Sequence, residues 1–112
     1  MFYRKTRGYT SRMLFMIIEH FRNGDPRPIR DRFLRDGRML PDGVVYHASW
    51  IDGPNARCYQ LMEAPDASAI EAWIARWNDL VEFEVIPVVT SQEYWSKFTD
   101  DRENSSTSSA NS

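Results

Sequence analysis

MLFMIIEHF, residues 13–21, is the first regular element that the sequence predicts. Six apolar residues lead into Glu19, His20 and Phe21, and the run is short, rich in Met and Phe and partly β-branched. These features are typical of a strand buried on both faces, although the period alone also permits a segment of helix. The stretch therefore predicts a core strand that ends in two titratable side chains, either of which can face a site.

The segment after this strand predicts a helix and then a hairpin. Asp25 is a typical N-cap and Pro26 suits the first helical position, so we expect a helix over residues 26–40. Gly37 lies on its apolar stripe and indicates either a close approach to a sheet or an early end of the helix. Two extended runs then flank DGPN, residues 52–55, which is a strong hairpin signal.

The second half of the chain repeats this alternation. Asp66 can cap a helix over residues 66–81, in which apolar residues recur at helical spacing. Residues 82–89 are typical of a strand, and Pro87 places that strand at a sheet edge or near its end. Thr90, with Glu93 three residues later, predicts a short terminal helix.

The order of these elements is βαββαβ followed by a helix. Two split crossovers of this length give a four-stranded antiparallel sheet with both helices on one face, which is the ferredoxin-like α+β fold with a short extra C-terminal helix. We expect one domain over residues 13–98, preceded by a flexible basic leader over residues 1–12. The Ser-rich residues 99–112 cannot bury enough apolar surface to order and are expected to be disordered. Translation starts at Met1 or Met13, and the sequence leaves both open.

The hairpin sets which side chains share a face of the sheet. A loop with an even number of residues would pair His47 with Gln60, Ser49 with Cys58, and Val45 with Met62. An inserted bulge would reverse this assignment. The other face of the hairpin would carry Tyr46, Ala48, Trp50, Tyr59 and Leu61.

The face away from the helices is expected to be apolar. It would carry Leu14, Met16, Ile18, Val45, Ile51, Met62, Ile86 and Val88. An apolar surface of this extent is too large to leave in water. A second copy of the chain is its simplest cover, so the sequence predicts a homodimer.

Five blocks in order carry a resemblance to a known family. MLFMIIEHF is followed by GRMLPDG (37–43), CYQLME (58–63), WIARWNDL (73–80) and FEVIPV (83–88). Together they resemble the small bacterial proteins grouped as domain of unknown function 3303, over about residues 13–91. The resemblance implies a dimeric α/β barrel, in which two ferredoxin-like sheets pack face to face around a central space. It implies no activity, because the family has none established, and nothing carries over to the leader or to the residues after Ser91.

A site in that space would use the few polar groups expected on the open face. These are His47, Gln60, Ser49 and Glu84, joined by His20 if it shares the side of Met16 and Ile18. A histidine opposite an amide, with a carboxylate nearby, can act as a general base, so the catalytic candidates are His47, His20 and Glu84. Ligand contacts would come from Gln60, Ser49, Met16 and Met62. The alternative is that these are satisfied core polar groups or a hydrogen-bonded dimer seam.

We expect no metal and no cofactor. His20 and His47 are distant in sequence, and no His, Glu or Cys spacing of the usual metal-binding kinds occurs. Haem-degrading relatives by fold take their axial histidine from the second helix, whereas residues 66–81 contain no histidine. Trp73 and Trp77, one helical turn apart, are expected to pack in the core.

Composition and charge narrow the partners. The chain has 112 residues, of which 42% are hydrophobic and 27% charged, and suits a single soluble domain. A net charge of −2 gives no field that would attract nucleic acid. Cys58 is the only cysteine, which favours a buried thiol in a reducing compartment. No apolar run is long enough for a membrane span or a secretion signal, so we expect a cytoplasmic protein without nucleic-acid or membrane partners.

Two functions remain open from the sequence. The first is a homodimeric barrel that binds a small apolar or aromatic metabolite between its two sheets, with cofactor-free chemistry on that metabolite. The second is a non-catalytic interaction or assembly module, whose open sheet face is only a dimer interface.

Overall fold

The computed structural model describes residues 12–99. The predicted leader (1–12) and tail (99–112) therefore lie outside the described residues, except for Arg12 and Thr99. The elements run in the order β1, α1, β2, β3, α2, β4 and α3, with one turn of 3-10 helix over Arg22–Gly24 after β1. Their bounds are β1 Met13–Phe21, α1 Arg27–Asp36, β2 Val45–Asp52, β3 Arg57–Ala64, α2 Ala67–Ile74, β4 Val81–Val88 and α3 Ser91–Thr99.

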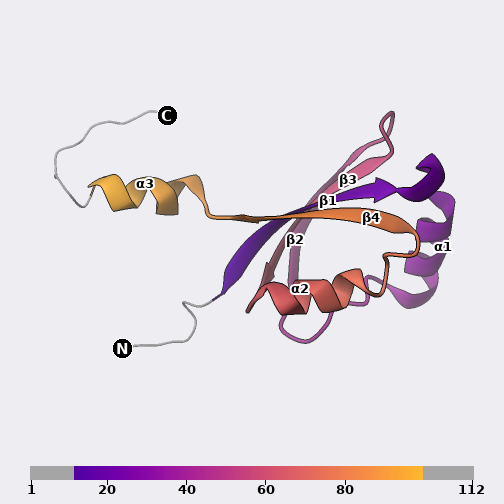
Figure 1. Ribbon diagram of the computed structural model, residues 1–112, viewed down its shortest axis with the longest axis horizontal. Helices are drawn as coiled ribbons and strands as arrows, with labels where there is room; N and C mark the ends of the chain where they lie inside the picture. Colours follow the sequence, from indigo (N-terminus) through magenta and orange to yellow (C-terminus); the bar gives the residue numbers. More distant parts are fainter. Residues whose placement is uncertain (1–11, 100–112) are drawn as a thin grey trace.

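The four strands form one antiparallel sheet in the order β2-β3-β1-β4. Helices α1 and α2 lie on the same side of this sheet, whereas α3 extends beyond its end (Figure 1). This is the predicted ferredoxin-like α+β fold with an additional C-terminal helix. Pro87 lies on β4, which is an edge strand, as its missing N–H requires.

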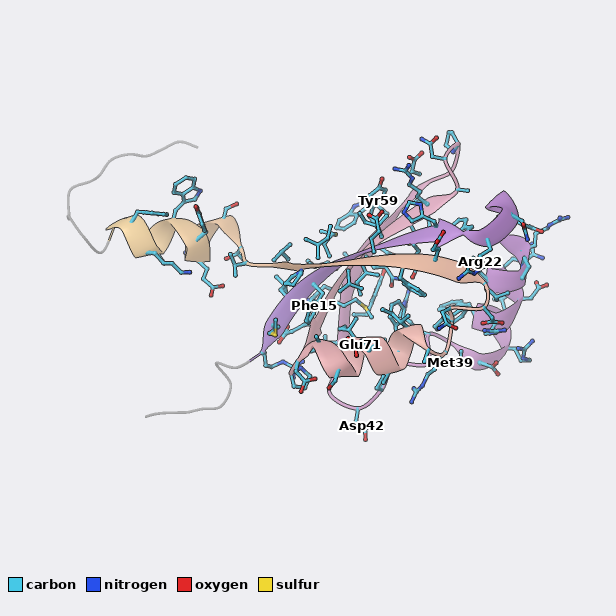
Figure 2. All side chains as sticks on the ribbon, in the orientation of Figure 1. Phe15, Arg22, Met39, Asp42, Tyr59 and Glu71 are labelled. Atoms are coloured by element: carbon cyan, nitrogen blue, oxygen red, sulfur yellow. The ribbon has the colours of Figure 1, made fainter. Side chains whose placement is uncertain are left out.

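The strand β1 shows how the sheet separates its two faces. From Phe15 to Glu19, every second residue of the strand points toward the helices. These residues are buried, namely Phe15, Ile17 and Glu19, whereas the residues between them are only half-buried. Figure 2 shows Phe15 in the layer between the sheet and α2. The buried core consists of Phe15, Ile17, Val44, Met62, Ala64, Ile70, Trp73 and Trp77. The strand β1 is therefore fully buried only on the face that the helices cover, and not on both faces as predicted.

Both helices on this side are shorter than predicted. α1 ends at Asp36 instead of reaching residue 40, because Gly37 takes a φ of 73° and its N–H closes the helix on the Phe33 carbonyl. The helix α2 begins as predicted, with the Asp66 side chain accepting from the Ala69 N–H at 3.0 Å. It ends at Ile74 rather than residue 81, and turns from there to Leu80 still bring Trp77 into the core.

The hairpin register differs from the predicted one. Ser49 pairs with Gln60 and Ile51 with Cys58, and the register shifts between Tyr46 and Ala48. This bulge turns Tyr46 toward the helices, where it packs against the core. The pairing of Ile17 with Gln60 then fixes the face, because Ile17 points at the helices.

The consequence is a corrected pair of faces. Ser49, Ile51, Cys58, Gln60 and Met62 do share a face, but it is the helix-covered one and not the open one that we expected. The open face instead receives Ala48, Trp50, Tyr59 and Leu61, which we had placed on the other side. It keeps six of its predicted apolar residues, namely Leu14, Met16, Ile18, Val45, Ile86 and Val88.

Candidate functional site

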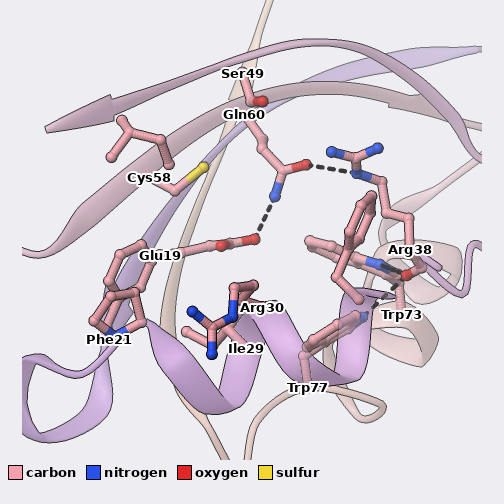
Figure 3. A pocket seen from close by; sticks show the side chains of 13 residues that line it. Glu19, Phe21, Ile29, Arg30, Arg38, Ser49, Cys58, Gln60, Trp73 and Trp77 are labelled. Atoms are coloured by element: carbon pink, nitrogen blue, oxygen red, sulfur yellow. Dashed lines mark hydrogen bonds between the residues drawn. The ribbon is translucent and has the colours of Figure 1, made fainter. Parts of the chain in front are cut away.

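A cavity of about 380 Å³ lies between the helix α1 and the sheet. Most of its wall is apolar, with aromatic rings from Phe21, Phe33, Trp73 and Trp77. The polar groups that reach it are the side chains of Glu19, Arg30, Arg38, Ser49 and Gln60 (Figure 3). The arrangement is that of a small-molecule site, since such sites are concave and largely apolar with a few convergent polar groups.

The cavity exists because α1 does not fill the space beneath it. The helix buries none of its residues, and Phe33, the largest apolar side chain on it, remains 42% exposed. Ile29 packs only against the margin of the core. The early stop at Gly37 also shortens the apolar stripe that a longer helix would have laid on the sheet.

Three side chains form a polar chain along one side of the cavity. The Gln60 amide Nε2 donates to the Glu19 carboxylate, and the Gln60 Oε1 accepts from the Arg38 Nε at 3.3 Å (Figure 3). The arginine therefore fixes the orientation of the amide, which in turn must present its N–H to the carboxylate. Glu19 and Gln60 are both buried, at 8% and 4% exposed.

The loop after α1 holds Arg38 in place. The backbone carbonyl oxygen of Arg38 accepts hydrogen bonds from the indole N–H groups of Trp73 and Trp77, each at 3.0 Å. Its guanidinium lies over the ring of Tyr46, 3.7 Å from the ring centroid, which is a cation–π contact. The two tryptophans thus anchor the backbone of the site while their rings line its wall.

Burial controls the acid–base properties of the cavity. Desolvation raises the pKa of Glu19 to about 7, although the hydrogen bond from Gln60 and the charge of Arg38 oppose this. Near neutral pH the carboxyl group is therefore present in both protonation states. Burial, aided by Glu19, raises the pKa of the Cys58 thiol to about 12, so Cys58 stays protonated and is a poor nucleophile.

The structure divides the residues that we predicted to form one site. Gln60 and Ser49 line the cavity under α1, and Met62 is fully buried in the core. Met16 and Glu84 lie on the open face, as predicted, and His20 shares that face, which the sequence left open. The pairing of β1 with β3 forces this division, because Gln60 and the open-face groups alternate on opposite sides of the sheet.

The two histidines are found in separate surroundings on the open face. The Nε2 atom of His20 lies 3.4 Å from a carboxylate oxygen of Glu84 without forming a hydrogen bond. The Nε2 atom of His47 is 2.8 Å from Glu63, whose other oxygen is bonded by Arg12. Both hydrogen bonds lower the pKa of Glu63, and the one from Arg12 has the larger effect. The predicted opposition of His47 and Gln60 is wrong. His47 lies on the open face, as predicted, whereas Gln60 faces the helices, and the bulge between Tyr46 and Ala48 is what separates the two.

The sequence alone leaves open whether Glu19 or His20 faces the site, and it does not indicate Arg38. The signal for Glu19 was present in its spacing, since it follows Phe15 and Ile17 at period two on the strand's most buried side. No local signal identified Arg38, because its role depends on contacts with residues far along the chain.

Neither a metal centre nor a membrane span is found in the part of the chain that the structure describes. Among residues 12–99, no group of His, Cys, Asp and Glu side chains is arranged to hold a metal ion. None of the described helices combines the length and the apolar character needed to cross a bilayer.

Comparison with known proteins places the chain in one family. The model of a domain of unknown function (DUF3303) matches residues 13–100. The chain belongs to this family. No curated protein and no solved structure matches it significantly. The family match extends past Ser91, where we expected the resemblance to stop, and so it includes the helix α3.

Proposed function

We propose that this protein binds a small, largely apolar molecule, preferably an aromatic one, in the cavity beneath α1. The observation that carries this proposal is the buried Glu19 carboxyl group at the edge of an aromatic-walled space of about 380 Å³. That volume falls within the range of small-molecule sites, which is about 300 to 1,000 Å³. Aromatic rings provide the wall and the Arg38–Gln60–Glu19 chain provides the polar end.

The polar end determines what the ligand must carry. A carboxyl group with a pKa of about 7 donates a hydrogen bond when protonated and accepts one when ionised. It is therefore suited to a ligand with one hydroxyl or carbonyl group on an apolar body. Glu19 can give a proton to that group or take one from it without a metal, which is the role of a general acid or base.

The site in this proposal lies within a single chain. We had expected ligands between two sheets, but Gln60 and Ser49, two of the groups chosen for that space, reach the cavity under α1 instead. Binding should therefore survive dissociation of any dimer. This separates the ligand site from the question of assembly.

Ligand binding can be tested with a panel of aromatic and isoprenoid metabolites, using native mass spectrometry and then calorimetry on the hits. We expect Glu19→Gln to weaken binding of a hydroxyl ligand by about tenfold, because a neutral hydrogen bond replaces the charge-assisted one to the ionised carboxylate. Glu63→Gln is the matched control, because Glu63 lies on the opposite face, and it should leave affinity unchanged. Ser49→Leu should block the cavity. Equal affinities in all of these variants would refute the site.

A second role is supported by the open sheet face, which is apolar and which none of the helices described within residues 12–99 covers. Val45, Trp50 and Ile86 on this face are 44%, 56% and 43% exposed. We propose that it packs against a second copy of the chain, as an assembly surface independent of the ligand site. Burial of about half of its apolar side chains would contribute roughly 10 kcal/mol per chain before the cost of association.

Dimerisation can be tested by sedimentation of the unmutated chain and of Ile86→Asp. We expect a dimer in the micromolar range or tighter, which the aspartate converts to a monomer while helical content is retained. Leu34→Asp is a suitable control, because Leu34 is 74% exposed on the outer side of α1. A monomer at tens of micromolar for the unmutated chain would contradict this second role and leave the ligand proposal intact.

A further inference from the structure

The helix α3 projects from the end of β4 and away from the body of the domain (Figure 1). All its side chains from Ser91 to Phe98 are exposed. Tyr94, Trp95 and Phe98 are 45%, 60% and 50% exposed and contact one another, with ring centroids 5.0 to 5.6 Å apart. We call these three residues the aromatic trio.

A short helix with exposed aromatic side chains needs contacts with another surface to be stable. It has nine residues, whereas isolated helices shorter than about 12 to 15 residues are marginal in water. Thr90 contributes a cap, since its Oγ1 accepts from the Glu93 N–H at 3.0 Å. The family match includes α3, so the helix is a part of the family domain and not an appended tail.

A groove of about 450 Å³ lies at the root of this helix, where β1 begins and β4 ends. Its apolar wall is formed by Met13, Leu14, Pro87, Val88 and Val89, of which Met13 and Val89 are 38% and 50% exposed. The remaining lining residues are polar or charged, namely Arg12, Glu63, Thr90 and Glu93 of α3 itself. Leu14 and Val88 also belong to the open face. The groove is therefore continuous with the surface that we propose to pair with a second copy.

We infer that the α3 helix of one chain lies in this groove of a second chain, and that the second chain returns the contact with its own α3. The inference extends the open-face dimer proposed above. Within residues 12–99, each chain carries one aromatic helix and one groove with an apolar wall that no other described element covers, which is the self-complementary pair that two-fold symmetry requires.

The surface area that this exchange would bury is large enough for a stable interface. An aromatic side chain can bury about 150 to 250 Å², so half of the aromatic trio amounts to roughly 300 Å² per arm. Two arms and the two surfaces beneath them would bury on the order of 1,200 Å², which is the lower end of the range for specific interfaces. Contact between the open faces adds to this area.

The charges on α3 favour a protein surface over a membrane. Between Ser91 and Phe98 the helix has one acidic side chain, Glu93, and one basic side chain, Lys97. Helices that bind anionic bilayers carry a cluster of basic residues on the polar face, and α3 has none. A second copy therefore suits it better than a lipid surface.

Cysteine cross-linking between differently tagged chains tests the exchange directly. One chain carries Met13→Cys in the groove and the other carries Phe98→Cys in the aromatic trio. Because Cys58 remains a buried, protonated thiol, it does not need to be removed. We expect a mixed disulfide-linked dimer from this pair. Ser96→Cys, which the helical period places on the far side of α3, should cross-link at least several-fold less.

Association measurements separate this inference from the dimer itself. We expect Trp95→Ala to weaken the dimer by about tenfold, as the loss of a buried tryptophan commonly does, and Ser96→Ala to leave it unchanged. A dimer that is unaffected by Trp95→Ala and gives no mixed disulfide would overturn the arm exchange and leave the open-face dimer standing. A monomeric unmutated chain would overturn both.

Discussion

The layer between the helices and the sheet is filled at the α2 end and hollow at the α1 end. Under α2, the side chains of Ile17, Met62 and Ile70 are fully buried, and Trp73 meets Phe83 edge to face with centroids 5.4 Å apart. Under α1 there is a cavity of about 380 Å³. The composition of the helices accounts for this, because ASAIEAWI has no basic residue whereas RPIRDRFLRD has four arginines.

The same comparison explains how a carboxyl group comes to be buried. Ile17 and Glu19 are two residues apart on one face of β1, yet the first lies under the filled end and the second at the cavity. In the filled end an ionisable side chain would lack polar partners and would be costly. At the hollow end, Gln60 and the charge of Arg38 supply them. The protein therefore keeps most of its packed core and its candidate chemistry in different halves of one layer, with Trp73 and Trp77 at the boundary because their rings also line the cavity.

The largest effect is expected from breaking the filled end. Trp73→Ala should lower the free energy of unfolding by about 3 to 5 kcal/mol, because it removes a buried ring and leaves a void. The Arg38 carbonyl keeps its bond from Trp77, so the loss reflects packing more than hydrogen bonding. Urea denaturation followed by circular dichroism measures it. A loss below about 1 kcal/mol would show that the α2 end is not the stability centre.

The next effect concerns pH and the hollow end. Folding raises the pKa of Glu19 from 4.5 to about 7, so the folded state binds this proton more tightly than the unfolded state does. The contribution of Glu19 to stability is therefore fully present below pH 4.5, falls between pH 4.5 and 7, and is lost above that. At about 1.4 kcal/mol per pKa unit, this amounts to on the order of 3 kcal/mol.

Glu19→Gln should remove this pH dependence and make the protein more stable than the unmutated chain at pH 8. Glu63→Gln is an informative control, because the pKa of Glu63 is lowered by Arg12 and His47. Its contribution has the opposite sign and is lost as the pH falls. Thermal unfolding between pH 4 and 8 measures both variants, and a Glu19→Gln profile parallel to that of the unmutated chain would contradict the desolvation of Glu19.

The sequence predicted the fold because its local signals agree with the tertiary arrangement. MLFMIIEHF, the Asp66 cap and the Thr90 cap each act within a few residues, and the structure contains the elements that they indicate. The elements in turn allow few topologies. The positions of the helix ends were predicted less closely. The positive φ at Gly37 ends α1 at Asp36, and the sequence pattern alone does not require it there.

The site could not be predicted to the same extent, because it depends on one residue of register. The bulge between Tyr46 and Ala48 and the pairing of Ile17 with Gln60 decide which face receives each polar group. A shift of one residue exchanges the faces of a strand, and the energies that select the register come from packing across the whole sheet. The cavity likewise results from space that α1 leaves unfilled above the sheet. The periodicity of apolar residues gives no information about that space.

The smallest stability effect is expected from Phe33→Ala at the hollow end. Its ring is 42% exposed, and its described contacts include the Arg38 guanidinium at 5.2 Å from the ring centroid. Removing it should therefore cost less than about 1 kcal/mol of unfolding free energy, as is usual for substitutions outside the packed core. Ligand affinity should nevertheless fall about fivefold, because the ring forms part of the cavity wall. Paired denaturation and calorimetry would separate the two quantities. A loss of stability close to that of Trp73→Ala would show that α1 is packed as tightly as α2, and the contrast between the filled and hollow ends would fail.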